Sequence, residues 1–209
     1  PEKPATMGYI VKAIEGMAEA CRELDFPVVS GNVSLYNETD GKAIPPTPVV
    51  GGVGLIEDVS KIATLKGAQP GDALILIGET KGHLGASLYA REWLGLKGEA
   101  LGSPPSIDLE TEKKNADFVR ELIHKGLVNA VHDVSDGGVA CAAAEMALAS
   151  GVRVFVSAEH LAIQNSEEVK QHYAALMFSE TSGRYLVSAP EERVQEVWAQ
   201  ADSAGIARS

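Results

Sequence analysis

After residue 66, short apolar segments alternate with amphipathic segments, and glycine-rich or polar turns separate them. Alternation of this kind is typical of proteins that pack helices onto a β-sheet. The pattern predicts strands over 73–77, 127–131, 152–156 and 184–188. It predicts helices from about Leu84 and over 108–125, 138–150, 166–177 and 190–204. We therefore expect a mixed α/β or α+β fold.

The first 65 residues follow a different pattern. Apolar side chains with helical spacing predict an amphipathic helix of about 18 residues, which Asp25 and Pro27 end because proline disfavours a helical residue before it. Turn residues over 37–42 separate a strand that starts at Val28 from a second strand over about 47–56. We expect a helix plus β-hairpin layer in residues 1–65, a boundary near residue 65, and a second domain over 66–209.

Composition excludes several classes of protein. The chain has 209 residues and a formal net charge of −11, whereas binding to nucleic acid or an anionic membrane requires clustered Lys and Arg. No apolar run is long enough to span a membrane. Cys21 and Cys141 each lie in an apolar helical pattern, which indicates reduced thiols and a cytoplasmic protein. Glycine contributes 21 residues and aromatic residues only 5%, which favours close main-chain approach to a ligand over aromatic stacking.

The strongest local signal is the polar segment over residues 30–37. In a strand, Asn32 and Ser34 lie on one face, and Gly31 lets a ligand or a second backbone approach closely. An asparagine carbonyl oxygen suits Mg²⁺, and a serine hydroxyl can bind a phosphate or a substrate hydroxyl. The alternative is a strand whose polar face meets water, with Gly31 at a bulge.

A second signal lies where a predicted strand ends and a helix begins, over residues 131–139. The carboxylates of Asp133 and Asp136, followed by two glycines, suit a turn that binds an anion or a metal ion. An aspartate or serine of this stretch could equally cap a buried helix. His132 could act as a base, although a hydrogen-bonded histidine at a strand end fits the same sequence.

Two further polar stretches follow or precede predicted strands. Residues 78–85 combine a lysine with several glycines, but their spacing is not that of a P-loop. Residues 178–184 offer hydroxyls, a glutamate and a glycine, either for a site or for a plain turn. The histidines and cysteines are scattered, which argues against a zinc site.

Taken together, several segments resemble the phosphoribosylformylglycinamidine synthase family, whose fold is similar to that of aminoimidazole ribonucleotide synthetase. The resemblance runs in order from Pro1 to about Ser188 and is carried by GNVSLYNET, PPTPVVGGVGLIEDV, GDALILIGETKGHLGASLY, HDVSDGGVACAAAEMA and FSETSGRYLVS. It implies the later part of a second A domain (1–65) and most of a second B domain (66–209). Pro1 in place of a Met, and an apolar segment that starts near the C-terminus, also suggest one stretch of a longer polypeptide.

The resemblance implies an ATP-dependent C–N ligase of purine biosynthesis with glutamine as amido donor. Mg·ATP would activate the amide oxygen of formylglycinamide ribonucleotide (FGAR), and ammonia would displace it. The family pattern implies that Gly31 contacts ATP, Asn32 binds Mg²⁺ and Ser34 binds substrate. Pseudo-symmetry within the family implies an auxiliary nucleotide or metal site at Asp133, with a vestigial structural turn as the alternative.

Three further expectations come from the resemblance. A glutaminase subunit and a small bridging subunit would be partners. The family's catalytic histidines lie in the first A and B domains, so this chain alone should lack catalytic residues and synthase activity. An apolar sheet without its usual cover could also self-associate. The alternatives are a synthetase of the same fold, such as aminoimidazole ribonucleotide or selenophosphate synthetase, and a non-catalytic scaffold or interaction module.

Overall fold

The computed structural model describes residues 2–156 and 173–209. These residues form two compact units, residues 1–55 and 56–209, which we call unit 1 and unit 2. Each unit is described by itself. The mixed α/β fold class that the sequence predicts is confirmed. Among the described residues, no helix is both long and apolar enough to cross a membrane.

Unit 1 consists of one long helix, a short hairpin and extended chain. Helix α1 (Pro4–Glu23) confirms the predicted amphipathic helix, with Pro4 at its start. Strands β1 (Glu38–Thr39) and β2 (Lys42–Ala43) pair antiparallel around Asp40 and Gly41, which both have positive φ. Turns of this kind match the twist of the two strands that they join. The predicted turn over 37–42 is therefore confirmed.

The longer strands predicted in unit 1 are wrong. Residues 28–37 and 47–56 carry no strand, and the short hairpin lies between these two segments. A strand requires a neighbour for its backbone groups, and neither segment has one among the described residues. Their apolar side chains are exposed, for example Val29 at 89% and Val53 at 92%. The apolar pattern is present in the sequence, but this chain supplies no partner that would turn it into a sheet.

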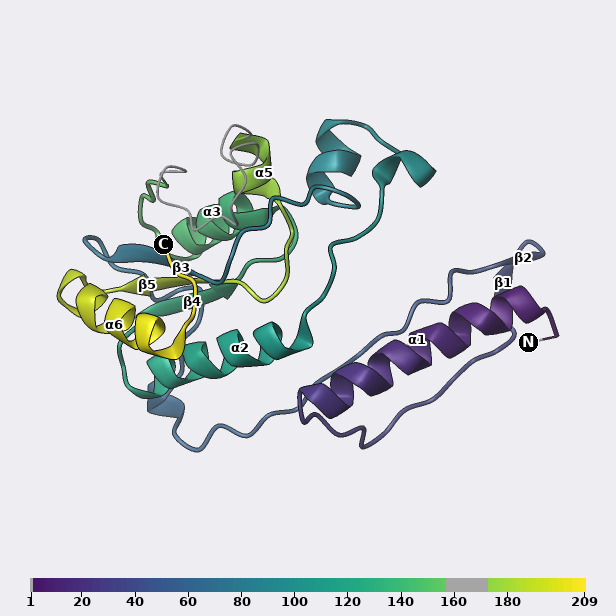
Figure 1. The fold of residues 1–209 in the computed structure, drawn as a ribbon, viewed down its shortest axis with the longest axis horizontal. Coiled ribbons are helices and arrows are strands. Elements are labelled where there is room, and N and C mark those ends of the chain that lie inside the picture. Colours follow the sequence, from purple (N-terminus) through teal and green to yellow (C-terminus); the bar gives the residue numbers. More distant parts are fainter. Residues whose placement is uncertain (1, 157–172) are drawn as a thin grey trace. The chain divides into compact units, whose positions relative to one another are not determined.

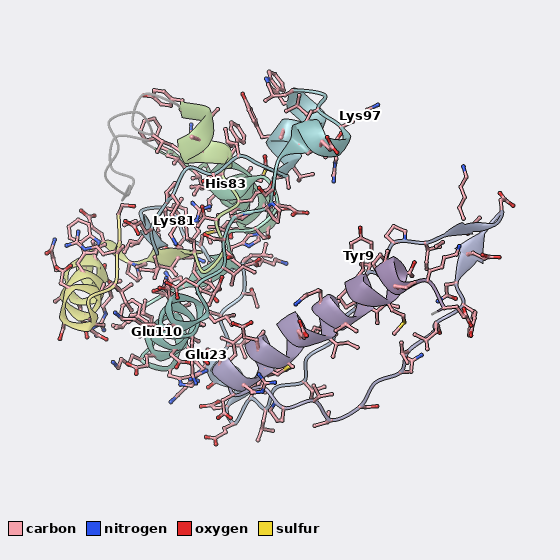
Figure 2. All side chains as sticks on the ribbon, turned by 45° about the vertical axis from the view of Figure 1, so that its right-hand side comes forward. Tyr9, Glu23, Lys81, His83, Lys97 and Glu110 are labelled. Atoms are coloured by element: carbon pink, nitrogen blue, oxygen red, sulfur yellow. The ribbon has the colours of Figure 1, made fainter. Side chains whose placement is uncertain are left out.

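Unit 2 is built on an antiparallel sheet of β3 (Ala73–Ile77), β5 (Tyr185–Ala189) and β4 (Ala130–Asp133), in the order β3-β5-β4. Helices α2 (Leu109–His124) and α6 (Val194–Ala204) cover one face, and α3 (Gly138–Ser150) and α5 (Tyr173–Phe178) lie on the other (Figure 1). Short helical turns complete the unit: η1 (Val59–Lys61), η2 (Tyr89–Trp93), η3 (Gly98–Leu101) and η5 (Glu191–Arg193).

Alternation along the strands divides the core between these two faces. Ile75 and Val187 pack with Phe118 and Leu122 of α2 and with Val197 of α6. Leu76 and Leu186 face the other way and pack with Val139, Ala142 and Met146 of α3. Because successive side chains of a strand point to opposite faces, these central strands are buried on both sides, as their continuous apolar sequence indicates.

Most predicted elements of unit 2 are confirmed, and the differences have local causes. The strand over 73–77 and the helix over 138–150 match, and α2 begins after Asp108, whose carboxylate accepts the Thr111 N–H. The helix expected near Leu84 is instead a π-helical turn that begins at Tyr89. Strand β4 begins at Ala130, where Thr64 and Ser188 lie beside it, and not at Leu127.

The last two predicted elements lie beside or within the undescribed segment. Residues 152–156 alternate between half-buried and exposed, as an edge strand would, but they form no ladder among the described residues. The strand predicted there is therefore wrong. Of the helix predicted over 166–177, residues 166–172 lie outside the described residues, and α5 covers the rest.

Candidate ligand pocket

One end of the sheet in unit 2 carries a pocket of about 380 Å³, which we call the sheet-end pocket. Its walls come from residues far apart in the sequence. They are Gly85, Ala86, Pro104, Pro105, Glu112, Asp133, Val134, Ser135, Asp136, Glu180, Ser182, Gly183, Arg184 and Tyr185. Three stretches that the sequence singles out, residues 78–85, 131–139 and 178–184, therefore contribute to the same cavity.

The register of the sheet explains why these stretches meet. Tyr185 pairs with Asp133 on β4 and with Ile77 on β3. The first residue of β5 therefore lies beside the last residues of both neighbouring strands, because both pairings are antiparallel. The loops that follow β3 and β4 and the loop that precedes β5 all leave the sheet at this edge.

Glu180 joins three of these segments. Its Oε1 atom accepts the backbone N–H of Leu88 at 2.8 Å and that of Gly137, also at 2.8 Å. Gly137 is the residue before α3, and Leu88 is the residue before η2. A negatively charged oxygen is stabilised at the start of a helix, where backbone N–H groups lack partners inside the helix. Glu180 therefore holds the loop before β5 against the starts of two helical segments.

Among the described residues, Arg184 is the only charged residue that is buried, with 1% of its surface exposed. Its guanidinium donates to the carbonyls of Ser179 and Thr181, at 2.6 and 2.9 Å, and to Thr80 Oγ1 at 2.9 Å. Burial lowers the pKa of Arg184 to about 10. The group remains charged at neutral pH and fixes the turn before β5 to the loop after β3.

The pocket is otherwise acidic. Carboxylates of Glu112, Asp133, Asp136 and Glu180 line it, against the single guanidinium of Arg184. Burial raises the pKa of Tyr185, and the charges of Glu112 and Asp133 raise it further. Both effects favour the neutral phenol, because a phenolate would lose hydration and face negative charge.

Asp133, at which the sequence predicts an auxiliary nucleotide or metal site, lies on the pocket wall. The neighbouring His132 has its Nδ1 atom 3.3 Å from Asp133 Oδ1 and its Nε2 atom 3.0 Å from Glu145 Oε2. Both ring nitrogens therefore have carboxylate neighbours within this chain. This arrangement favours the hydrogen-bonded histidine over the free base.

The other candidate residues lie in unit 1. Gly31, Asn32 and Ser34 are exposed and belong to no strand. Gly31 has no positive φ, and a Cβ atom added to it would meet nothing within 4 Å. The described chain therefore gives no internal reason for a glycine at this position. The Ser34 carbonyl accepts a bond from the Asn37 side chain at 3.3 Å.

Metal ligation is limited in the described part of the chain, which contains no cluster of three or more His, Cys, Asp or Glu side chains arranged to hold a metal ion. Asn32 offers a single neutral amide oxygen, whereas Mg²⁺ is usually held by one or two carboxylates together with water and substrate phosphates. The described residues of this chain therefore do not by themselves fit a magnesium site.

Sequence reasoning missed part of the pocket. Glu112 belongs to a charged helix and is indistinguishable there from its solvated neighbours, and Pro104 and Pro105 read as an ordinary loop. Of the pocket residues that were not predicted, only Arg184 carries a usable sequence signal. An arginine at the start of an apolar strand is expected to be buried and therefore to require hydrogen-bond partners.

Comparisons with known proteins cover nearly the whole chain. Residues 69–208 match the family "AIR synthase related protein, C-terminal domain", and residues 1–56 match "AIR synthase related protein, N-terminal domain". The chain is 52% identical to phosphoribosylformylglycinamidine synthase subunit PurL of Caulobacter vibrioides and 52% identical to that of Methylocella silvestris. Each match covers 99% of this chain but only 27% and 26% of the relative, so the chain spans about a quarter of their length.

Solved structures show the same fold. T. maritima PurL complexed with FGAR has a TM-score of 0.59 at 20% identity, over 72% of this chain and 25% of that one. T. maritima PurL complexed with ATP has a TM-score of 0.57 at 16% identity, over 72% of this chain and 23% of that one.

Proposed function

Because this chain belongs to the AIR synthase related protein family, we propose that it forms part of a phosphoribosylformylglycinamidine synthase, an ATP-dependent ligase of purine biosynthesis. The observation that carries the proposal is identity of about one half to synthase subunits over 99% of the chain. The reaction would join ammonia, derived from glutamine, to FGAR at the expense of ATP. The ATP and FGAR complexes of the T. maritima relative support both ligands.

Within this function, we assign ATP contact to Gly31, Mg²⁺ to Asn32 and substrate to Ser34. The open space around Gly31 and the exposure of all three residues support these roles, because nothing in the described chain competes with a ligand for them. Because Asn32 offers one amide oxygen, the remaining metal ligands would come from elsewhere in the synthase. A glutaminase subunit and a small bridging subunit would complete the enzyme complex. Its location would be the cytoplasm, consistent with the two free cysteines.

A chimera tests this proposal. The matching quarter of the Caulobacter vibrioides subunit is replaced by this chain, and ammonia-dependent ADP release is measured with FGAR and ATP. We expect the chimera to keep activity, Asn32→Ala to lose most of it, and Asn32→Asp to keep more because an oxygen ligand remains. The chain alone should give no turnover. An inactive chimera that folds, or turnover by the chain alone, would contradict the proposal.

A further inference from the structure

The start of α3 has the sequence features of an anion site, but its geometry differs. A strand ends at Asp133, two glycines follow, and a helix of 13 residues begins. Backbone N–H groups at such a position commonly bind a phosphate. Here the N–H of Gly137 points to a carboxylate of the same chain, Glu180, at 2.8 Å.

The surrounding backbone leaves little room at this position. A Cβ atom on Gly138 would lie 2.7 Å from the carbonyl oxygens of Met177 and Ser179, so the segment before Glu180 crosses directly over the first turn of α3. Met177 to Glu180 therefore covers the helix start with its main chain and then supplies a carboxylate to it. Gly138, which has no Cβ atom, permits this crossing within the chain.

The same oxygen of Glu180 also accepts the N–H of Leu88, at the start of η2. Two N–H groups from segments 49 residues apart therefore converge on one charged atom, as they would on a phosphate oxygen. Arg184 holds the same loop in place through the carbonyls of Ser179 and Thr181. The position of Glu180 is thus fixed on both sides.

We propose that Glu180 is a specificity-determining residue of the sheet-end pocket: its carboxylate occupies the anion position at the start of α3 and thereby excludes phosphate groups from it. This proposal concerns unit 2 alone and is independent of the roles assigned to Gly31, Asn32 and Ser34. It implies that a ligand of this pocket meets carboxylates and not free backbone N–H groups at this wall.

The test uses inorganic phosphate as the probe and the amide signals of Leu88 and Gly137 in ¹⁵N NMR spectra as the readout. In the unchanged chain, we expect neither signal to move with phosphate. In Glu180→Ala, both signals should move together and saturate, at phosphate concentrations about tenfold or more below the highest one at which the unchanged chain shows no response. Glu192→Ala removes the same charge beyond the opposite end of β5 and should behave like the unchanged chain.

A second variant protects the test against misfolding of Glu180→Ala. Glu180→Gln keeps the shape of the side chain but not its charge, so the amide proton signals of Leu88 and Gly137 should both shift upfield without phosphate, since a charged acceptor forms the stronger bond. The proposal is overturned if these signals of the unchanged chain respond saturably to phosphate. It is equally overturned if folded Glu180→Ala shows no response, or if Glu180→Gln leaves both signals in place.

Discussion

At the scale of single residues, Tyr185 provides a direct measure of the electrostatics of the sheet-end pocket. Burial, and then the charges of Glu112 and Asp133, raise its pKa above the ordinary value of about 10. The folded state thus favours the neutral phenol. The contribution of Tyr185 to the free energy of unfolding is complete below its unfolded pKa and is lost as the pH rises through the higher folded pKa.

The corresponding prediction concerns the ionisation of this phenol, followed by the ultraviolet absorbance of tyrosinate and isolated by subtracting Tyr185→Phe. We expect Tyr185 to titrate above the ordinary tyrosine range, and Glu112→Gln to shift its titration to lower pH because one of the opposing charges is removed. Glu192→Gln, beyond the opposite end of β5, should leave it unchanged. Titration in the ordinary range would show that neither burial nor the neighbouring carboxylates raise the pKa of this phenol.

Arg184 has a structural role that can be measured as stability. In Arg184→Met the carbonyls of Ser179 and Thr181 lose their buried donor, and we expect a loss of about 2–4 kcal/mol in the free energy of unfolding. Urea denaturation followed by circular dichroism measures it. Arg120→Met removes an arginine that pairs with Asp117 at the surface, and should cost no more than about 1 kcal/mol. Equal losses for the two variants would refute this role.

At the scale of elements, the start of α3 depends on the crossing of two backbones. Gly138 and Gly126 both have positive φ, at +68° and +66°, but only Gly138 has backbone atoms close to the position of a Cβ. We expect Gly126→Ala to cost about 1–2 kcal/mol, from conformation alone. Gly138→Ala should cost about 3 kcal/mol or more, because the segment over 177–179 must also move. Thermal unfolding of both variants compares them, and similar losses would mean that the crossing is loose.

The same elements show what the sequence could and could not predict. Where a segment carries its own signals, the prediction is right: Asp108 caps α2, and the apolar runs of β3 and α3 have partners within unit 2. In unit 1 the apolar pattern over 47–56 predicts a strand, but pairing depends on a neighbour that the pattern itself cannot supply. The site follows the same rule. Asp133, which lines the pocket, was singled out from its local sequence. The convergence of two backbone N–H groups on Glu180 depends instead on how β4 and β5 pair.

At the scale of the whole molecule, the two units differ in how they bury apolar surface. Unit 2 has a core on both faces of its sheet. In unit 1, α1 has no buried residue, and several valines and Leu55 are more than half exposed. So many exposed apolar side chains are uncommon on a stable monomer and indicate a contact that the described residues do not supply. In a synthase, the remainder of the protein would supply that contact.

The isolated chain should therefore self-associate through unit 1, and its mass in solution tests this. We expect light scattering to give a mass above that of one chain that increases with protein concentration, because Val49 and Val53 are 96% and 92% exposed. Changing both to Glu should restore a monomer, since charge opposes burial of the surface. Leu148→Glu, which changes an exposed apolar residue of α3 in unit 2, should leave the mass unchanged. A chain that remains monomeric at every concentration would mean that unit 1 covers its apolar segments without a partner.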